Sequence, residues 1–573
     1  MLYGTAMYID IVPNRKSPPA ILLRESVRQG KKIVKRTIAN LSSLSLEQAQ
    51  AIRRILKGEK LVQPEAHFDI LSSRAHGHAE AVLLTIRKLG LDKLIGSRRC
   101  KERDLVIAMI ASRILGPQSK LALSRGWENT TLGESLAVED ADEDALYAAM
   151  DWLYARQEQI EKRLADRHLQ EGGRVLYDLS SSYFEGTQCP LAKRGYSRDQ
   201  KKGKLQVNYG LLTDERGCPV SISAFPGNTS DPTTLLPQVE RLQGAFNLKS
   251  VILVGDRGMI SQKQVEELKG HAGVDWITAL KTGAIRKLMD AQAIQLALFD
   301  ERNLFEFTHA DFPGEKLVAC RNPELAARRK HKREALLKAT VEALEKIQGM
   351  VVRGTLKDAD KIGIRVGRVI NQYKMAKHFT LEIAENQFRF QIDEEKVHAE
   401  AALDGIYVIR TSVADDLSAE DAVRHYKALS QVERAFRSIK TMDLEVRPIH
   451  HYQEQRVRSH LFLCMLAYYV KWHMMEAWRP LLFADEDQQA KQDRDAVAPA
   501  ERSSQAIAKV RSKQLSDGSP AHSFQSLLRN LATIVRNSCQ CRDTEAGAPA
   551  FTIDTLPTST QQKAFQLLKK IRV

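Results

Sequence analysis

Short apolar runs and alternating patterns predict strands through the middle of the chain. Residues 175–180 combine Val, Leu and Tyr in a pattern typical of a buried strand. Residues 204–213 alternate apolar and polar side chains, 214–217 (Asp-Glu-Arg-Gly) favour a hairpin turn, and 219–225 predict the return strand. This stretch therefore predicts three consecutive antiparallel strands.

The next segments alternate between helical and strand patterns. Residues 233–246 form an amphipathic helical pattern, and 251–254 are a short all-apolar strand of the kind buried on both faces. A helix over 261–270 and a strand over 276–280 follow. The order predicts a mixed α/β core that still lacks its closing helix.

The closing helix is delayed by residues 282–400, which we interpret as an α+β insertion domain. Within it, Asn-Pro opens a helix over 322–347, and two alternating segments form a hairpin over 378–392. A strand over 406–411 then precedes the helix predicted over 419–440. This helix is the one expected to complete the core.

The overall charge changes the picture from a generic α/β protein to one that binds a polyanion. The chain has 573 residues, 86 Lys+Arg against 71 Asp+Glu, a net charge of +15 and a pI near 9.3. Nucleic acid is the natural partner of such a protein, although a merely basic protein is the alternative.

Seven scattered cysteines without a CxxC pair predict reduced thiols in a cytoplasm. The apolar run 461–470 is too short to span a membrane, so we expect a core helix and no membrane partner.

Composition and period together predict a division into seven segments. A small β pattern begins the chain, and helical periods dominate residues 79–168. The expected domains are 1–60, a small β-rich unit; 61–170, a helical DNA-binding region; 171–281, the first part of a catalytic domain; 282–400, the insertion; 401–480, the second part of the catalytic domain; 481–522, a polar linker; and 523–573, C-terminal helices.

Two aspartates occupy positions where an ionised carboxylate is unusual in a protein core. Asp178 lies in the middle of the first core strand, where an ionised group costs several kcal/mol unless it is paired. The alternative is that it ends the strand and caps the following serines. Asp256 lies between two glycines after the strand 251–254, at a strand end where ligand chemistry collects. A turn stabilised by local hydrogen bonds is the alternative there.

The helix predicted over 419–440 carries a third carboxylate, Glu433. Tyr426, Glu433 and Lys440 are seven residues apart, so they lie on one stripe of an α-helix, each about 10 Å from the next along the axis. A solvated surface face is the alternative. Three arginines on the same helix have no evident matching acid: Arg424, Arg434 and Arg437. Three isolated carboxylates in a basic chain suit two-metal phosphoryl chemistry with Mg²⁺.

These residues resemble the DDE transposases of bacterial insertion sequences, in particular the group with a Tyr-Arg-Glu-Lys signature after a β-rich insertion. The resemblance covers roughly 174–480 and includes residues 194–199 with Leu205-Gln206, and residues 225–230. It implies a ribonuclease H-like mixed sheet with flanking helices. It also implies that Asp178, Asp256 and Glu433 are the catalytic and metal-binding residues, with two Mg²⁺ ions that Mn²⁺ can replace. The residues expected to contact DNA are Tyr426, Lys440, Arg434, Arg437, Arg424 and Arg257.

The resemblance implies a cytoplasmic, nucleoid-associated transposase. Such an enzyme binds the terminal inverted repeats of its own element as double-stranded DNA, cleaves by metal-dependent hydrolysis, and joins the 3′ ends to target DNA. A homodimer on DNA is expected. Two rival functions stay open: a structure-specific nuclease on the same core, and a non-catalytic, transposase-derived DNA-binding regulator.

Two positions depart from the family pattern. The signature arginine, three residues after Tyr426, is Leu429 in this chain, so Arg424 or Arg434 is the candidate to supply that charge. Some relatives use a tryptophan of the insertion to hold a flipped base, and residues 282–400 contain no Trp. If a base is flipped in this protein, Phe or Tyr must hold it.

Overall fold

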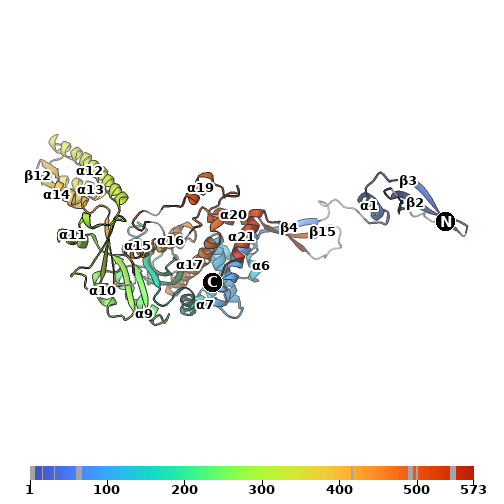
Figure 1. Ribbon diagram of the computed structural model, residues 1–573, viewed down its shortest axis with the longest axis horizontal. Coiled ribbons are helices and arrows are strands. Elements are labelled where there is room, and N and C mark those ends of the chain that lie inside the picture. The colour runs from blue at the N-terminus through green and yellow to red at the C-terminus, as the bar shows by residue number, and fades with distance from the viewer. Residues whose placement is uncertain are drawn as a thin grey trace. The chain divides into compact units, whose positions relative to one another are not determined.

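A computed structural model describes residues 7–15, 17–30, 32–59, 68–413, 417–487, 495–498, 501–541 and 550–572, with Leu296 described for its backbone alone. The chain forms two compact units (Figure 1). The smaller unit comprises 1–73 and 536–555, and the larger comprises 74–535 and 556–573. The predicted sites all lie in the larger unit.

The smaller unit contains the predicted N-terminal β segment. Strands β1 (Met7–Val12), β2 (Ala20–Gln29) and β3 (Lys32–Asn40) form an antiparallel sheet. Helix α1 (Leu46–Leu56) packs against it through the buried Ala49, after a capping box between Ser45 and Gln48. A second sheet has the order β16–β15–β4, from Phe551–Asp554, Val535–Cys541 and Phe68–Ala75.

An eight-stranded mixed sheet forms the centre of the larger unit. Its order is β10–β11–β14–β9–β8–β5–β6–β7. The first five strands in the sequence are β5 (Arg174–Tyr183), β6 (Gln206–Asp214), β7 (Pro219–Pro226), β8 (Val251–Gly255) and β9 (Val274–Ala279). Strands β5, β6 and β7 pair antiparallel, whereas β8 lies parallel to both β5 and β9. The predicted mixed α/β class and these strands are confirmed.

Helices of the N-terminal and C-terminal segments share one apolar core with this sheet. Helix α17 (Glu454–Ala477) packs against β7, α4 and α7, and residues 461–470 are all buried, as the apolar run predicted. Within the described residues, no helix is long and apolar enough to cross a membrane. The helices before the sheet are α2 (Gly77–Lys88), α3 (Leu91–Ile95), α4 (Lys101–Leu115), α5 (Lys120–Arg125), α6 (Leu132–Leu136), α7 (Glu143–Tyr154) and α8 (Gln157–His168).

Two helices connect the strands that carry the predicted aspartates. Helix α9 (Leu235–Gln243) lies between β7 and β8, and α10 (Gln262–Leu268) lies between β8 and β9. Both present leucine and valine side chains to the core, since Leu235, Val239 and Val265 are fully buried. These crossovers allow β8 and β9 to run parallel to β5.

The segment predicted as an insertion is not separate from the central sheet along its whole length. Strands β10 (Leu304–Phe307) and β11 (Lys316–Arg321) pair with each other and with β14 (Ile406–Thr411), so they extend the sheet beyond β9. Helix α11 (Thr282–Asp290) packs on β14. The apolar run Leu317–Cys320 pairs on both sides, which explains why it is buried.

The rest of this segment has a core of its own (Figure 1, yellow). It consists of α12 (Pro323–Val352), α13 (Ala359–Tyr373), the hairpin β12 (Phe379–Ala384) and β13 (Gln387–Ile392), and α14 (Glu394–Ala401). The predicted Asn322 cap, the first-turn Pro323 and the hairpin are confirmed. Helix α13 was not predicted, although Ile362, Val366 and Ile370 recur every four residues.

The C-terminal predictions need two corrections. The polar segment 481–522 contains a helix, α19 (Ser504–Ser512), which begins at a Ser503 cap, while residues 488–494 and 499–500 lie outside the described residues. The segment 523–573 was predicted as helices alone, and this is wrong. Besides α20 (Phe524–Ala532) and α21 (Ser559–Lys569), it contributes β15, whose sequence is largely polar, and β16, whose Phe-Thr-Ile-Asp alternation is a strand signal that the prediction missed.

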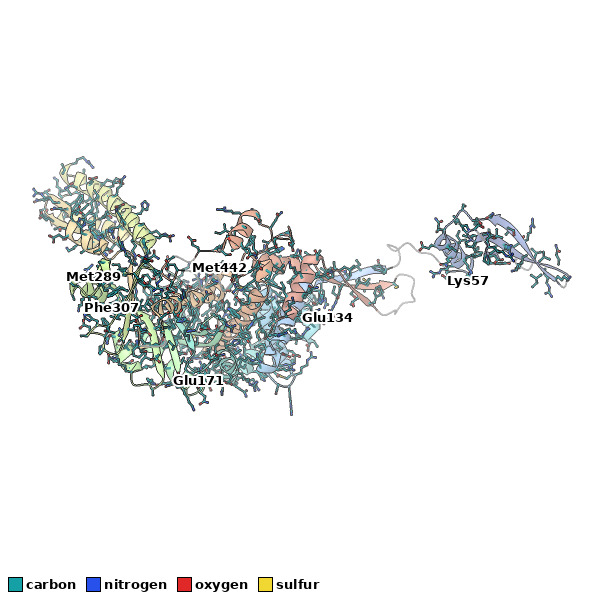
Figure 2. The ribbon with its side chains drawn as sticks, in the orientation of Figure 1. Lys57, Glu134, Glu171, Met289, Phe307 and Met442 are labelled. Carbon is teal, nitrogen blue, oxygen red and sulfur yellow. The ribbon has the colours of Figure 1, made fainter. Side chains whose placement is uncertain are left out.

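The helix predicted over 419–440 is divided. Helix α15 (Ala419–Lys427) and helix α16 (Leu429–Arg437) join at Ala428, which keeps helical dihedral angles. A π-helical turn follows over Ser438–Met442, closed by a hydrogen bond from the Asp443 N–H to the Ser438 carbonyl. This turn ends at Met442, which is exposed (Figure 2). The wider turn changes the direction of Lys440 relative to the predicted straight stripe.

Candidate active site

The two predicted aspartates lie on adjacent parallel strands. In the pairing of β5 with β8, Tyr177 is opposite Gly255, so Asp178 and Asp256 follow one residue later on each strand. Asp178 is partly buried within β5, whereas Asp256 is exposed immediately after β8. Because both strands run in the same direction, the two carboxylates leave the sheet at the same edge.

Glu433 comes from helix α16, which packs against β5. Apolar residues Val432, Ala435 and Phe436 are buried on the inner side of this helix, while Glu433 is exposed. Seven residues earlier in the chain, about two helical turns, α15 carries Tyr426. The Tyr426 hydroxyl donates a hydrogen bond to Asp256 Oδ1 at 3.3 Å, which fastens the helix pair to the end of β8.

The electrostatics of Asp178 show that the three carboxylates are close to one another. Burial, the largest cause, and the charges of Asp256 and Glu433 together raise the pKa of Asp178 to about 7, against the opposing effects of the Leu179 N–H and the Arg198 guanidinium. Burial also raises the pKa of Tyr426, and the same two carboxylates add to that rise. The structure therefore brings together all three acids predicted from the sequence.

Lys440 belongs to a buried ion network instead of lying open on the surface. Its ammonium group is 2.7 Å from the carboxylate of Asp199, whose side chain is 1% exposed, and it donates to Ser180 Oγ at 3.1 Å. Asp199 also pairs with Arg447 and accepts a hydrogen bond from the Tyr183 N–H at 3.0 Å. Asp199 was not among the predicted site residues, although it closes the motif 194–199 that carries the family resemblance.

The two further motifs of the resemblance meet beside β5. Gln206 donates to the carbonyls of Tyr196 and Gly227, at 3.0 and 2.7 Å. A Cβ added at Gly195 would lie 2.1 Å from the Gly227 carbonyl oxygen, so glycine is needed for this close backbone approach. Residues 194–199 and 225–230 thus form one layer next to the carboxylates.

Arg198 connects that layer with the helix that follows it. Its guanidinium binds both carboxylate oxygens of Asp231 at 2.6 Å, and its charge lowers the pKa of Asp178. Arg198 was likewise not singled out from the sequence. Arg198 therefore links the motif 194–199 to Asp231, and its positive charge partly offsets the negative charge around Asp178.

The arginines predicted to contact DNA differ in whether a carboxylate of the protein pairs with them. Arg257, Arg434 and Arg437 are exposed, and their guanidinium groups have no hydrogen-bonding or ionic partner within the described ranges. Arg424 is different: it pairs with Glu420 at 3.0 Å and Asp421 at 3.1 Å on its own helix. The prediction that Arg424 lacks a matching acid is wrong.

Leu429, which stands where the family signature has an arginine, is surrounded by apolar side chains. Leu429 is buried in the main core at the start of α16. A charged group at this position would be buried among apolar side chains, which is costly unless the charge is paired. Arg434, on the exposed side of the same helix, remains the nearer candidate to supply the charge.

The carboxylate cluster has the donor chemistry of a divalent cation site. Mg²⁺ and similar hard ions bind carboxylate oxygens, and mutually repelling carboxylates are stabilised when such an ion lies between them. Burial is the main cause of the raised pKa of Asp178, and the charges of Asp256 and Glu433 add to it. The three residues therefore fit the metal that the resemblance implies.

A second group of possible ligands is less suitable for a cation. His168, Cys218 and His473 place their ligand atoms within 4.8 Å of one another. Burial, with the guanidinium groups of Arg216 and Arg167, lowers the pKa of His168 to about 4 and that of His473 to about 3. The same positive field disfavours a divalent ion there.

Two transposase family models match the chain. A family model described as "Transposase DDE domain" matches residues 172–470, and one described as "IS1634 family transposase, N-terminal domain" matches residues 9–67. A search of curated proteins found no match. A solved structure of piggyBac transposase in a synaptic complex with hairpin DNA is 9% identical, covering 79% of this chain and 77% of that chain at a TM-score of 0.34.

The first match covers more than half of the 573 residues and includes Asp178, Asp256 and Glu433. DDE transposases bind DNA, use divalent metal ions, and cleave and join DNA strands. The two rival functions are therefore set aside, and the chain belongs to the DDE transposases, as the transposase of an insertion sequence.

Proposed function

We propose that Asp178, Asp256 and Glu433 form the catalytic centre of this transposase and hold two Mg²⁺ ions, with Mn²⁺ able to replace them. The observation that carries the proposal is the register of the adjacent parallel strands β5 and β8, which places Asp178 and Asp256 at one sheet edge, together with the Tyr426–Asp256 hydrogen bond that ties the helix pair carrying Glu433 to that edge. When bound, the metal supplies charge stabilisation for both the attacking and the leaving oxygen of the phosphodiester. Such ions need the oxygen donors that these three residues offer.

The other residues of the site have supporting roles in this proposal. Tyr426 orients the Asp256 carboxylate through its hydroxyl, and the Asp199 network holds β5 beside it through Lys440 and Ser180. Arg257, Arg434 and Arg437 are exposed and, in the part of the chain that the structure describes, have no acid partner, so we assign them to the phosphates that flank the scissile bond. Arg424, paired on its own helix, orients α15 instead.

We further propose that the sheet is a ribonuclease H-like core. Three antiparallel strands followed by two parallel strands, with the first acid on β5 and the second after β8, support that assignment. Residues 1–170 would recognise the terminal inverted repeats, and the part of 282–400 with its own core would be an insertion domain. We propose a homodimer on DNA and a cytoplasmic location, with which the seven free cysteines agree.

The decisive experiment is cleavage of the element's own end sequences by the purified full chain. Wild type with Mg²⁺ or Mn²⁺ should release a 3′-hydroxyl end and join it to target DNA, and chelation of divalent ions should stop both steps. Single changes Asp178→Asn, Asp256→Asn and Glu433→Gln should each abolish cleavage while DNA binding persists. Near-normal cleavage by any one variant removes that residue from the catalytic centre.

A further inference from the structure

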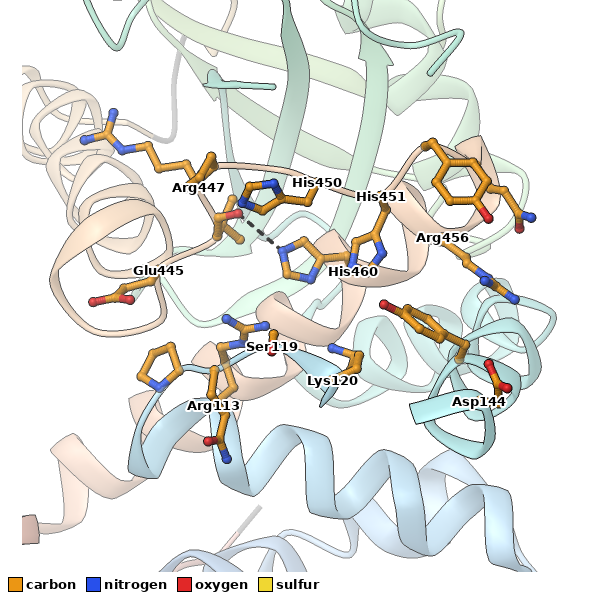
Figure 3. A pocket seen from close by; sticks show the side chains of 17 residues that line it. Arg113, Ser119, Lys120, Asp144, Glu445, Arg447, His450, His451, Arg456 and His460 are labelled. Carbon is orange, nitrogen blue, oxygen red and sulfur yellow. Dashed lines mark hydrogen bonds between the residues drawn. The ribbon is translucent and has the colours of Figure 1, made fainter. Parts of the chain in front are cut away.

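A second charged site lies away from the carboxylates, in a cavity of about 550 Å³ within the larger unit. Its walls come from the end of α4, the start of α5, α7, the segment 445–453 and the start of α17. In Figure 3, Arg113 and Lys120 reach into it from one side, and His450, His451 and His460 lie on the other. Segments distant in the sequence therefore build one basic cavity.

Two of the cations in this cavity are buried without a counter-charge. Arg113 is 8% exposed and Lys120 is 6% exposed. Within the described ranges Lys120 has no hydrogen-bonding or ionic partner, and Arg113 donates only to the Leu444 carbonyl, at 3.4 Å. Burial of an unpaired ammonium beside a guanidinium costs several kcal/mol, so the free protein maintains this arrangement at a cost.

The neighbouring charged groups do not neutralise this pair. Burial, followed by the charge of Arg113, lowers the pKa of Lys120 to about 8, which leaves it mostly protonated at neutral pH. The acids that line the cavity, Asp144 and Glu445, are exposed and form no ion pair with either cation. Burial also lowers the pKa of His451 to about 3 and that of His460 well below its usual value, so both rings are neutral.

The remaining arginines of the wall are already paired and connect the cavity to the active site. Arg456 binds the Asp151 carboxylate at 3.0 Å. Arg447 binds Asp199, which also binds Lys440, and Lys440 donates to Ser180 two residues after Asp178. The cavity thus shares a wall residue with the network that supports the catalytic strand.

We propose that this cavity binds a phosphate of the DNA strand held at the carboxylate site, with Arg113 and Lys120 as its ligands. This inference rests on the proposed function, because the phosphate belongs to the DNA that the proposed catalytic centre cleaves. The ammonium supplies a point charge and the guanidinium supplies paired donors, which together suit the oxygens of one phosphodiester. Arg447 and Arg456 are already paired with carboxylates, and His451 and His460 are neutral, so Arg113 and Lys120 are the wall cations available to the phosphate.

The first test measures binding of the full chain to its own element ends over a range of salt concentrations, with divalent ions chelated. Lys120→Met and Arg113→Met should each weaken binding about tenfold, the loss expected for one charge-assisted contact. The slope of log affinity against log salt should fall by about 0.9 when one phosphate contact is lost. Wild-type affinity and slope in both variants would overturn the proposal.

The matched control is Lys471→Met, since Lys471 is 3% exposed on α17 but pairs with Asp443. This change leaves a buried carboxylate unpaired, so it should lower the thermal midpoint without changing the salt slope. Lys120→Met should instead raise the midpoint of the free protein, because it removes an uncompensated charge. A lowered midpoint for Lys120→Met would show that the charge is compensated in the free protein and would count against the proposal.

Inorganic phosphate separates the two possible sources of the anion. In the presence of EDTA, phosphate should raise the thermal midpoint of the wild type and not that of Lys120→Met. If phosphate stabilises the wild type but Lys120→Met keeps full DNA affinity, the cavity binds an adventitious ion only and the DNA assignment is wrong. Loss of cleavage in Asp178→Asn with retained DNA binding tests the catalytic proposal independently of this one.

Discussion

The carboxylate site and the basic cavity are both clusters of like charge, but they differ in sign and in exposure. Asp256 after β8 and Glu433 on α16 are exposed, whereas Arg113 and Lys120 are buried among helices. Elsewhere in the larger unit, buried charges are paired, as in Arg410 with Glu315 and Lys471 with Asp443. Where the fold leaves like charges together, a ligand of the opposite sign is the simplest reason.

The largest effect is expected where the acidic cluster is broken. Glu433→Gln keeps the shape of the side chain but removes one carboxylate ligand, so cleavage should fall about a thousandfold or more, as metal stabilisation is worth several kcal/mol. Binding of end DNA should be unchanged or tighter, because an acid that repels phosphate is gone. Single-turnover cleavage and a binding titration on the same preparation measure both.

The control for this change is Glu420→Gln on the preceding helix, where the carboxylate pairs with Arg424 and Arg302. It should leave the cleavage rate within a few-fold of the wild type. Equal losses from Glu433→Gln and Glu420→Gln would show that general charge, and not metal binding, governs the rate.

The next largest effect is expected in the ion network in which Lys440 and Arg447 pair with Asp199. Lys440→Met leaves Asp199 with one cation fewer, and loss of one partner of a buried pair typically costs about 3–5 kcal/mol. The free energy of unfolding, from denaturant titration, should therefore fall, while the salt slope of DNA binding stays at the wild-type value. A reduced slope with unchanged stability would instead make Lys440 a direct phosphate ligand.

The sequence predicted the acidic cluster better than the basic cavity for a physical reason. Asp178 and Asp256 violate local expectations, since one is an acid within a strand and the other lies between glycines after a strand. Arg113 and Lys120 violate nothing locally: each follows an ordinary helical pattern, and their burial arises from contacts with the distant segment 445–453. Spacing along one chain cannot reveal such a meeting.

Helix α16 and the central sheet show the same limit. The seven-residue spacing predicted one stripe for Tyr426 and Glu433, and the Tyr426 hydroxyl does reach Asp256. The π-helical turn over Ser438–Met442 and the pairing of Lys440 with Asp199 depend on tertiary contacts, which the spacing does not contain. Strands β10 and β11 fell within a predicted insertion because pairing with β14 over nearly 90 residues leaves no local signal. The polar strand β15 likewise depends on its neighbours for its conformation.

A smaller effect is expected in the pH dependence of thermal stability, which Lys120 of the basic cavity should influence. Because the folded pKa of Lys120 is about 8, below the usual value of 10.5, the unfolded chain binds this proton more tightly between these two pH values. The destabilisation that Lys120 causes should be complete below about pH 8 and should disappear as the pH rises toward 10.5. The thermal midpoint of Lys120→Met minus that of the wild type should shrink over this range.

The groups facing Lys120 set the conditions for that measurement. Arg113 on α4 stays charged throughout, and burial keeps Cys464 on α17 protonated because its thiol pKa is raised. His451 and His460 are already neutral. Arg113→Met, which removes the neighbouring charge, should reduce the pH dependence. A midpoint difference that stays constant from pH 7 to pH 10.5 would show that Lys120 is neutral or compensated in the free protein.

The smallest effect per charge is expected in the smaller unit, where cations are exposed and dispersed. Strand β3 carries exposed Lys32, Lys35 and Arg36, while Lys31, predicted with them, lies outside the described residues. If this strand contacts the element ends, replacing the three by alanine should weaken specific binding by a few-fold per contact and lower the salt slope by up to about 0.9 for each.

The matched control is the triple change of Arg53, Arg54 and Lys57 to alanine, which removes the same charge from the exposed side and end of α1. Both triple variants lower the net charge equally, so a non-specific field would weaken binding equally in each. Binding to the element ends and to random DNA of the same length should separate the cases. A larger loss from the β3 variant on the element ends assigns recognition to the strand face, because surface cations contribute when a phosphate lies against them and little otherwise. Equal losses would leave the smaller unit as a general electrostatic surface and would place end recognition in the larger unit, with the basic run 328–333 of α12 as the next segment to change.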